Sequence, residues 1–410
     1  MEVWVEPSRA EGEVRAPYSK SWGIRTIFYS LIAPVKLVEV PESDDVKAAI
    51  NAVTALGVRR EGNAFVFEGP SREGKAFVGG SATTLRMLLP VATVLGVELE
   101  VDGDESLRKR PITEFVRVAK EHGIEISSDR LPLKVRGKFE GDSVEIRGGE
   151  SSQYVSGFMI AFAVRGYGRI TVLPPISSKS YIMMTRDLLT SMGVRVGLSI
   201  GDKWEITVER GSPKPYEGRV RGDFALASFY AIAASITGGK ARITGLYAPP
   251  RYFGDHSIVE LLAFMGVTSY VDNGVWEVYG EPRGGIRANV DDAPDLAVSI
   301  ATIAPFGKYV TEIEGVERLK IKESDRIATI IDTISAFGGK ARYESGRLVI
   351  EPSHLRPGEV ECPNDHRIAM MAGVIATKVG GRVRRAECVN KSNPDFWDDL
   401  SRMGVRLRKA

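Results

Sequence analysis

The sequence predicts an α/β fold of two domains, each built from three similar units of helices and short strands. Three observations lead to this prediction: the length of 410 residues, a pattern that recurs along the chain, and two kinds of helix that alternate within it. A chain of this length exceeds what one ordinary hydrophobic core fills, so two domains of about 200 residues each are expected.

The recurring pattern has a period of roughly 70 residues, which is longer than the periods of solenoid repeats. Each copy contains an apolar helix, a strand, a second helix and a further strand, which a Gly-Val or Gly-Gly pair often introduces. The apolar helices of the successive copies read IRTIFYSLIAP, TTLRMLLPVATVLG, YVSGFMIAFAVRG, ALASFYAIAASITGG, LAVSIATIAPFG and RIAMMAGVIATKVGG. Six copies divide most simply into two domains of three.

The two helices of each copy differ in polarity. The first helix is apolar on all sides, which predicts that it is buried. The second, as in SDDVKAAINAVTAL at residues 43–56, has one apolar face and is expected to cover the outside. Residues 214–228, with Pro215, Gly218 and Gly222, are the expected crossing between the domains.

Composition narrows the classes of function. Hydrophobic residues make up 43% of the chain and charged residues 26%, as in soluble globular proteins. With 55 Lys and Arg against 53 Asp and Glu, no overall basic excess favours nucleic acid, and no apolar run is long enough to cross a membrane. Cys362 and Cys388 lack metal-ligand spacing, so free thiols in a reducing cytoplasm are expected.

A polar cluster lies at the start of each apolar helix. The clusters read PYSKSWGIR, GGSATTLR, GGESSQY, RGDFA, DDAPD and PNDHR. Ser, Asp and Asn are ordinary helix caps, but Lys20, Arg25, Arg86 and Arg367 are not, because a cation near a helix N-terminus opposes the helix dipole. The clusters therefore predict that the helix starts converge on a cleft that binds phosphates or carboxylates.

The stretch ERLKIKESDRIA, residues 317–328, is dense in charge. On one helix Lys322 and Arg326 would be neighbours of like charge, which an anion would stabilise. That anion is either the adjacent Glu323 or a bound ligand. The site lacks a Cys or His ligand set, which argues against a metal, and His366 is a further candidate for a direct role.

Together, the motifs SKSxxxR, KESDR, NDHR and NKSNPDF resemble the 5-enolpyruvylshikimate-3-phosphate synthase family of enolpyruvyl transferases. The resemblance covers the whole chain. It implies an α/β fold of two domains, each of three inverse βαβαββ units with buried helices. Residues 19–222 would form the shikimate 3-phosphate side, and residues 1–18 with 223–410 the phosphoenolpyruvate side.

The family joins phosphoenolpyruvate to shikimate 3-phosphate and releases phosphate, in the shikimate pathway to aromatic compounds. The resemblance implies no metal or organic cofactor, no nucleic-acid or membrane partner, and a monomeric cytoplasmic enzyme. It assigns shikimate 3-phosphate binding to Lys20, Ser21, Arg25, Ser151, Ser152, Gln153, Ser178, Asp295 and Lys322. It assigns phosphoenolpyruvate binding to Lys20, Ala82, Arg110, Gln153, Arg326, Arg367 and Lys391. Proton transfer would fall to Glu323, Asp295 and Lys20.

The chain departs from the family pattern at three places, of which Ser180, where Pro is common, is expected to matter little. Ala82 stands where glycine is usual, so its methyl group is expected to narrow the phosphoenolpyruvate pocket and weaken inhibition by compact phosphonate mimics. Arg318 stands where many members have Asn, so the substrate contact that this Asn makes is not carried over to this chain.

Two alternatives stay open. The related transferase that acts on UDP-N-acetylglucosamine usually carries a Cys in the loop that reads GDESLRKRPI here. A non-catalytic anion-binding protein could use the same basic residues, but Glu323 and Asp295 would repel the anion.

Overall fold

One strand arrangement occurs in all six four-stranded sheets of the computed structural model, which describes residues 1–410. In each sheet a parallel pair lies at one edge, and the inner strand of that pair continues into two antiparallel neighbours. The sixfold repeat predicted from the sequence is therefore confirmed, with its strands in sheets of one common topology.

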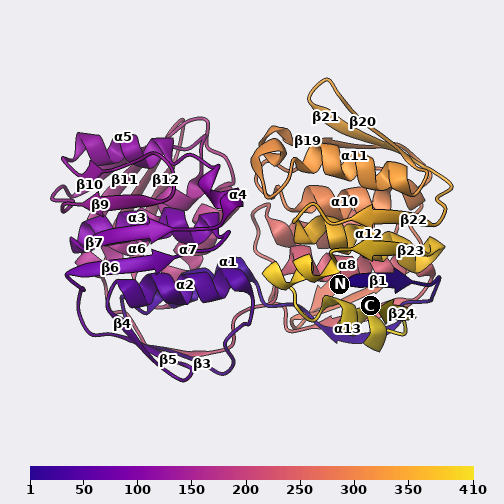
Figure 1. Cartoon of the computed structure of the whole chain (residues 1–410), viewed down its shortest axis with the longest axis horizontal. Coiled ribbons are helices and arrows are strands. Elements are labelled where there is room, and N and C mark those ends of the chain that lie inside the picture. The colour runs from indigo at the N-terminus through magenta and orange to yellow at the C-terminus, as the bar shows by residue number, and fades with distance from the viewer. The chain divides into compact units, whose positions relative to one another are not determined.

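The chain divides into two units (Figure 1), which we call the N-terminal unit, Lys20–Val220, and the C-terminal unit, Met1–Ser19 with Arg221–Ala410. The strands of the N-terminal unit are β3 (Val35–Leu37), β4 (Val58–Glu61), β5 (Ala64–Phe67), β6 (Glu73–Phe77), β7 (Glu98–Asp102), β8 (Glu125–Ile126), β9 (Leu133–Arg136), β10 (Ser143–Arg147), β11 (Tyr167–Leu173), β12 (Arg195–Ile200), β13 (Trp204–Glu209) and β14 (Tyr216–Gly218). Its helices are α1 (Lys20–Tyr29), α2 (Asp44–Ala55), α3 (Ala82–Leu95), α4 (Glu105–Arg108), α5 (Thr113–Glu121), α6 (Ser152–Arg165) and α7 (Lys179–Ser191).

The C-terminal unit repeats this plan. Its strands are β1 (Glu2–Val5), β2 (Gly12–Arg15), β15 (Lys240–Thr244), β16 (Thr268–Asp272), β17 (Val275–Tyr279), β18 (Arg287–Asn289), β19 (Thr311–Glu314), β20 (Lys340–Glu344), β21 (Arg347–Glu351), β22 (Gly358–Glu361), β23 (Gly381–Arg384) and β24 (Leu407–Lys409). Its α-helices are α8 (Phe224–Thr237), α9 (Ile258–Phe264), α10 (Leu296–Ile303), α11 (Arg326–Ala336), α12 (His366–Val379) and α13 (Phe396–Arg402). Its 3₁₀ helices are η1 (Asp255–Ser257), η2 (Ala304–Phe306), η3 (Glu317–Ile321) and η4 (Ala386–Lys391).

Strands from distant parts of the chain complete the sheets within each unit. In the N-terminal unit, β14 pairs in parallel with β3, with Tyr216 opposite Val35, which lies 181 residues earlier in the sequence. In the C-terminal unit, β2 pairs with β15, and β1 lies between β23 and β24. Each unit is thus closed by pairing between its first and last segments.

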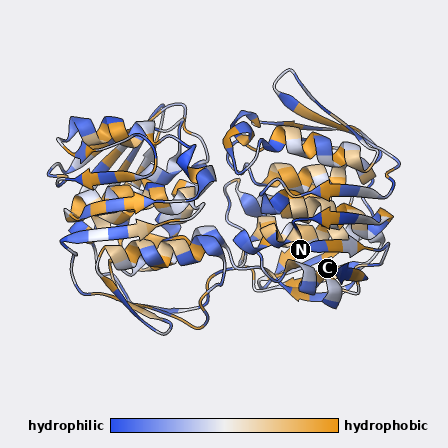
Figure 2. Ribbon diagram, in the orientation of Figure 1, coloured by the Kyte–Doolittle hydropathy of each residue, from blue (hydrophilic) through white to orange (hydrophobic).

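The two kinds of helix occupy the positions that their polarity predicts. Helices α1, α3 and α6 of the N-terminal unit, and α8, α10 and α12 of the C-terminal unit, are buried along most of their length. In α8 every residue from Phe224 to Ile236 is buried. Outer helices such as α5 alternate hydrophobic and hydrophilic residues (Figure 2), and they bury one face only. No helix is long and apolar enough to cross a membrane.

Cys362 and Cys388 form a disulfide with a Cα–Cα distance of 6.9 Å, so the expectation of free thiols was wrong. The cause is strand pairing. Strands β22 and β23 are parallel neighbours, so the segments that leave their carboxyl ends meet at one edge of the sheet. The backbone N–H of Cys362 donates to the carbonyl of Arg384 at 2.9 Å. The two cysteines are 26 residues apart in the sequence, and that spacing does not indicate that they lie close together.

Candidate active site

The six buried helices begin at the polar clusters that the sequence predicted. Their first residues are Lys20, Ala82, Ser152, Phe224, Leu296 and His366. Four of the residues just before these helices accept a hydrogen bond from a backbone N–H of the first turn; they are Ser81, Ser151, Asp223 and Asp365. Such caps satisfy donors that would otherwise stay unpaired at a helix start.

Asp295 occupies the cap position of α10 but makes no capping hydrogen bond. Its carboxylate binds two guanidinium groups instead. Oδ1 accepts from Nη1 of Arg326 at 2.7 Å, and Oδ2 accepts from Nη2 of Arg367 at 2.9 Å. Asp295 therefore links the starts of α10, α11 and α12 rather than stabilising its own helix.

Arg326 is the centre of a buried ion cluster. Only 1% of its side chain is exposed, yet it binds two further carboxylates besides Asp295. Nε donates to Oδ2 of Asp365 at 2.8 Å, and Nη2 donates to Oε2 of Glu323 at 2.9 Å. Burial opposes the charge, but Asp365, Glu323 and Asp295 together raise the pKa of Arg326 well above its ordinary value. The anions beside Arg326 are therefore groups of the chain itself.

The interpretation of Lys322 and Arg326 as neighbours on one helix is wrong. Lys322 follows η3 in an extended conformation, and α11 begins only at Arg326. The break arises because Asp325 caps α11, accepting from the backbone N–H groups of Ile327 and Ala328. The charge density of this stretch thus belongs to a connection between two helices.

Arg367 retains hydrogen-bonding capacity. Its side chain is 1% exposed, and its Nη2 binds Asp295, but its Nε and Nη1 are buried and have no hydrogen-bond partner. Burial opposes its charge, whereas the carboxylates of Asp295 and Asp223 raise the pKa of Arg367. Because buried donors are nearly always paired, two unpaired donors on a charged group indicate that this side chain receives an anion.

Two lysines adjoin the ion cluster. Nζ of Lys391, at the end of η4, lies 3.7 Å from Oε1 of Glu323. Lys322 is partly exposed, and burial among protein groups lowers its pKa to about 8, with Asp295 opposing the shift. Arg318 lies 3.6 Å from Asp291.

In the N-terminal unit, Gln153 joins the starts of α3 and α6. Its Oε1 accepts from Nη1 of Arg86 at 3.1 Å and from Oγ of Ser151 at 3.2 Å. Its Nε2 donates to Oγ1 of Thr83 at 2.6 Å. The network fixes the orientation of the amide between a cation and two hydroxyl groups.

The two cations of α1 are both paired inside the N-terminal unit. Nζ of Lys20 lies 2.9 Å from Oδ2 of Asp45. Arg25 is buried and donates to Oγ1 of Thr185 at 2.7 Å and to the carbonyl of Ser21 at 3.0 Å. Arg25 therefore braces α1 against α7 in this structure.

Ser178, at the cap position just before α7, has an unusual backbone conformation. Its φ of 53° lies in the left-handed region, which costs a non-glycine residue roughly 1–3 kcal/mol and occurs often at functional sites. Its side chain is buried. The N–H of Ser177 donates to the carbonyl of Gly148 at 3.3 Å, so the segments before α6 and α7 lie together.

Each unit therefore holds one group of the residues assigned from the sequence. The C-terminal group contains Asp295, Lys322, Glu323, Arg326, Arg367 and Lys391. The N-terminal group contains Lys20, Ser21, Arg25, Ala82, Arg110, Ser151, Ser152, Gln153 and Ser178. The sequence analysis missed Asp365, Asp45 and Thr83, which bind members of these groups. Of these, Asp365 could have been found from the sequence, because it is an acidic residue at the cap position of a helix, close to Arg367.

Comparison with known proteins points to one family. The pattern of the family described as EPSP synthase (3-phosphoshikimate 1-carboxyvinyltransferase) matches residues 5–400. A 3-phosphoshikimate 1-carboxyvinyltransferase of Sulfurisphaera tokodaii is 50% identical over 409 residues, and one of Saccharolobus islandicus is 42% identical over 414, each covering 99% of both chains. The solved EPSP synthase of Acinetobacter baumannii has a TM-score of 0.80 and 21% identity, covering 100% of both chains, and shares the fold.

The ion cluster predicts a large effect of Asp365→Asn on stability. The change keeps the shape of the side chain but removes a charge that is 0% exposed and paired with Arg326. Removing one partner of a buried ion pair costs roughly 3 kcal/mol when the other charge is left unpaired. Arg326 keeps the carboxylates of Asp295 and Glu323, so we expect a loss of up to about 3 kcal/mol in the free energy of unfolding of the C-terminal unit, measured by urea denaturation. The matched change Glu344→Gln, in an exposed pair with Arg342, should cost less than about 1 kcal/mol. Equal losses in the two variants would contradict the prediction.

Proposed function

The chain belongs to the EPSP synthase family, and on that premise we propose which of its residues bind each substrate and carry each proton. The enzyme transfers the enolpyruvyl group of phosphoenolpyruvate to the 5-hydroxyl of shikimate 3-phosphate and releases phosphate, a step of the shikimate pathway. The alternative acceptor UDP-N-acetylglucosamine is not favoured, because the curated relatives carry the name 3-phosphoshikimate 1-carboxyvinyltransferase.

Electrostatics sets the main requirement of this reaction. Each substrate carries a phosphate and a carboxylate, so each has about three negative charges near neutral pH. Bringing two such anions together in water is unfavourable. Fixed cations and amide dipoles must therefore offset the repulsion before the reaction begins, without having to reorganise during it.

We assign phosphoenolpyruvate to Arg367, Lys391 and Arg326 of the C-terminal unit, with Arg110, Ala82, Gln153 and Lys20 as further contacts. The observation that carries this assignment is the pair of buried, unpaired donors on Arg367. The oxygens of an anionic substrate can accept from these donors, as in other guanidinium–anion pairs. Asp295 and Asp365 hold Arg367 in place from its side chain and its backbone.

We assign shikimate 3-phosphate to the hydroxyl groups at the starts of α6 and α7. Ser151, Ser152 and Ser178 are buried, and each stands at a helix N-terminus, where the dipole favours a phosphate group. Ser21, Arg25, Lys20 and Gln153 complete the N-terminal contacts, with Asp295 and Lys322 assigned to the hydroxyl and carboxylate groups.

The reaction proceeds by addition and then elimination. The 5-hydroxyl attacks C2 of phosphoenolpyruvate while C3 receives a proton, which gives a tetrahedral intermediate. Loss of phosphate and of one C3 proton restores the double bond. One group must therefore give and then take a proton at C3, and another must accept the hydroxyl proton.

We assign the C3 proton to Glu323 and the hydroxyl proton to Asp295, with Lys20 assisting. The Glu323 carboxylate lies between Arg326 at 2.9 Å and Lys391 at 3.7 Å, so two cations fix its position. Asp295 is fixed in the same way by Arg326 and Arg367. Positioning of this kind lowers the entropic part of the activation barrier.

The proposal also includes a monomeric enzyme in the cytoplasm, which sedimentation and cell fractionation would test.

A phosphate-release assay tests the proposed function directly. Phosphoenolpyruvate with shikimate 3-phosphate should release phosphate steadily, because elimination follows addition of the second substrate. Phosphoenolpyruvate alone, or with UDP-N-acetylglucosamine, should release none above background. Release without an acceptor, or with only the nucleotide sugar, would refute the assignment.

Replacing the proposed C3 acid–base group should abolish turnover but not binding. Glu323→Gln keeps the size of the side chain and removes its proton transfer, so kcat should fall by about 10²–10⁴-fold. The Kd for shikimate 3-phosphate, measured by calorimetry, should change less than about twofold, because Glu323 has no assigned contact with it. The control is Glu317→Gln, which makes the same carboxylate-to-amide change at an exposed residue of η3. Near-normal turnover of the Glu323 variant would contradict the role.

The lowered pKa of Lys322 predicts an alkaline limb in the pH profile. Below about 8 the lysine is charged and attracts the anionic substrate, whereas above about 8 it becomes neutral. Because kcat/KM reports the free enzyme, kcat/KM for shikimate 3-phosphate should fall as pH rises through about 8. The Lys322→Met variant should have a lower kcat/KM for shikimate 3-phosphate, and its pH profile should lack this alkaline limb. Lys320→Met, an exposed change two residues earlier, should keep it. Persistence of the limb in Lys322→Met would disprove its assignment to Lys322.

A further inference from the structure

We infer that the Cys362–Cys388 disulfide is a positioning cross-link for the phosphoenolpyruvate-binding residues, an inference that rests on the function proposed above. The bond joins the segment that leads into α12 with η4. Cys362 precedes Asp365 by three residues, and Cys388 precedes Lys391 by three. One covalent bond therefore connects the two segments that carry Arg367 and Lys391.

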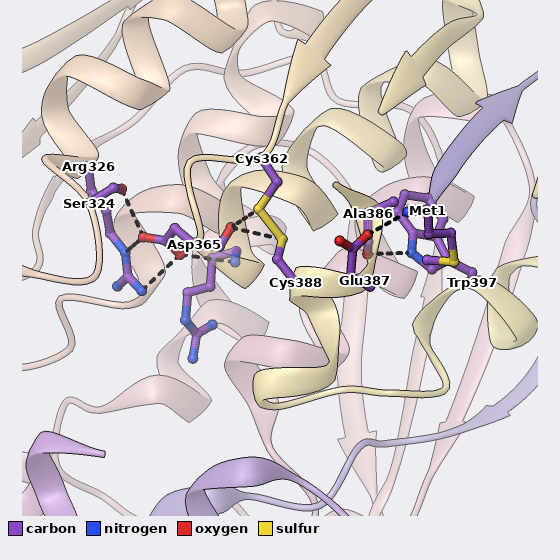
Figure 3. Close-up of a disulfide and its surroundings, with 10 residues drawn as sticks. Met1, Ser324, Arg326, Cys362, Asp365, Ala386, Glu387, Cys388 and Trp397 are labelled. Carbon is purple, nitrogen blue, oxygen red and sulfur yellow. Dashed lines mark hydrogen bonds and ion pairs between the residues drawn. A yellow bond between two sulfur atoms is a disulfide. The ribbon is translucent and has the colours of Figure 1, made fainter. Parts of the chain in front are cut away.

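The disulfide also contacts Asp365, a member of the ion cluster. The Sγ atoms of Cys362 and Cys388 lie 3.4 Å and 3.8 Å from the carbonyl oxygen of Asp365. Figure 3 shows Asp365 between the disulfide on one side and Arg326 with Ser324 on the other. Its carboxylate accepts from Arg326 at 2.8 Å and from Ser324 at 3.0 Å. The backbone and side chain of one residue thus connect the disulfide to the cluster.

These contacts form a closed ring. Asp365 binds Arg326, Arg326 binds Glu323, and Glu323 lies 3.7 Å from Lys391. The chain then returns from Lys391 through η4 to the disulfide and Asp365. The long Lys391–Glu323 pair is its weakest link, because partly exposed ion pairs contribute little. Without the disulfide, that pair would be the ring's only connection between Asp365 and Lys391.

Besides the disulfide, η4 packs directly against α12, and it has further contacts with other parts of the unit. The carbonyl of Ala386 accepts from Nε1 of Trp397 at 3.0 Å, and the amino group of Met1 lies 3.0 Å from Glu387 (Figure 3). Beyond η4, Nδ2 of Asn393 donates to the hydroxyl of Tyr230 at 2.9 Å. These contacts hold η4 against α13, the chain start and α8. The disulfide is the covalent bond that sets its distance from Asp365.

Opening the disulfide should therefore affect one substrate more than the other. Lys391 would move relative to Arg367, and both are assigned to phosphoenolpyruvate. Most residues assigned to shikimate 3-phosphate, including its three serines, belong to the N-terminal unit and have no link to this bond. The two in the C-terminal unit, Asp295 and Lys322, do not lie on η4, and Asp295 stays bound to Arg326 and Arg367. If the bond served stability alone, opening it would lower the melting temperature without changing one of the two KM values more than the other.

The experiment compares oxidised wild-type enzyme, the same enzyme after treatment with a phosphine reductant, and the double variant Cys362→Ala with Cys388→Ala. Thiol titration in denaturant establishes the state of the bond, and circular dichroism establishes that each sample is folded at the assay temperature. In both opened forms we expect KM for phosphoenolpyruvate to rise roughly tenfold, the scale of a small misplacement of binding groups. KM for shikimate 3-phosphate should change less than about twofold, and the reductant should not change the double variant further.

Three results would overturn the inference. The first is two titratable thiols in the untreated wild-type enzyme. The second is a folded, opened enzyme with both KM values unchanged, and the third is a rise of both KM values by the same factor. Absence of phosphate release from oxidised wild-type enzyme with both substrates would instead overturn the proposed function, and this inference with it.

Discussion

The buried ion cluster around Arg326 is the constraint on which the candidate site residues of the C-terminal unit depend. A guanidinium that is 1% exposed is bound by Asp295, Glu323 and Asp365. Burying these charges is costly unless every one is paired, so the cluster forms only when the starts of α10, α11 and α12 meet. The same contacts that make burial possible also hold Glu323 and Asp295, the two proposed proton carriers, in fixed positions.

The sixfold repeat explains how so many helix starts come together within each unit. In four repeats the edge strand of the parallel pair leads into a buried helix, which leads back to the inner strand of the same pair. The other two buried helices, α1 and α8, follow β2 and β14, which pair with strands of the other unit. The apolar helices fill the cores, as α8 does from Phe224 to Ile236. The polar residues just before them remain at the helix starts, where backbone N–H groups favour anions.

Some cations of the candidate site bind groups of the chain, whereas others keep hydrogen-bond donors or positive charge that a ligand can use. Arg326 and Arg25 already bind groups of the chain, which fixes the positions of these two proposed substrate contacts. Arg367 keeps two buried donors without partners, and Lys322 has a pKa lowered to about 8. An enzyme that binds polyanions needs both features, because cations that are already fixed in place need not reorganise, and donors without partners remain for the ligand.

The sequence alone determined the fold class, the six repeats and the start of each buried helix, because apolar periodicity and capping residues are local signals. Its motifs also indicated the residues of the site, through the resemblance they carry. It could not reveal the link between Lys20 and Asp45, the role of Asp365 as a shared partner, or the disulfide. It also placed Lys322 and Arg326 on one helix, where the structure has a break at Asp325. Contacts such as Cys362 with Cys388 depend on the pairing of β22 with β23, and that pairing exists only once distant segments have folded against one another.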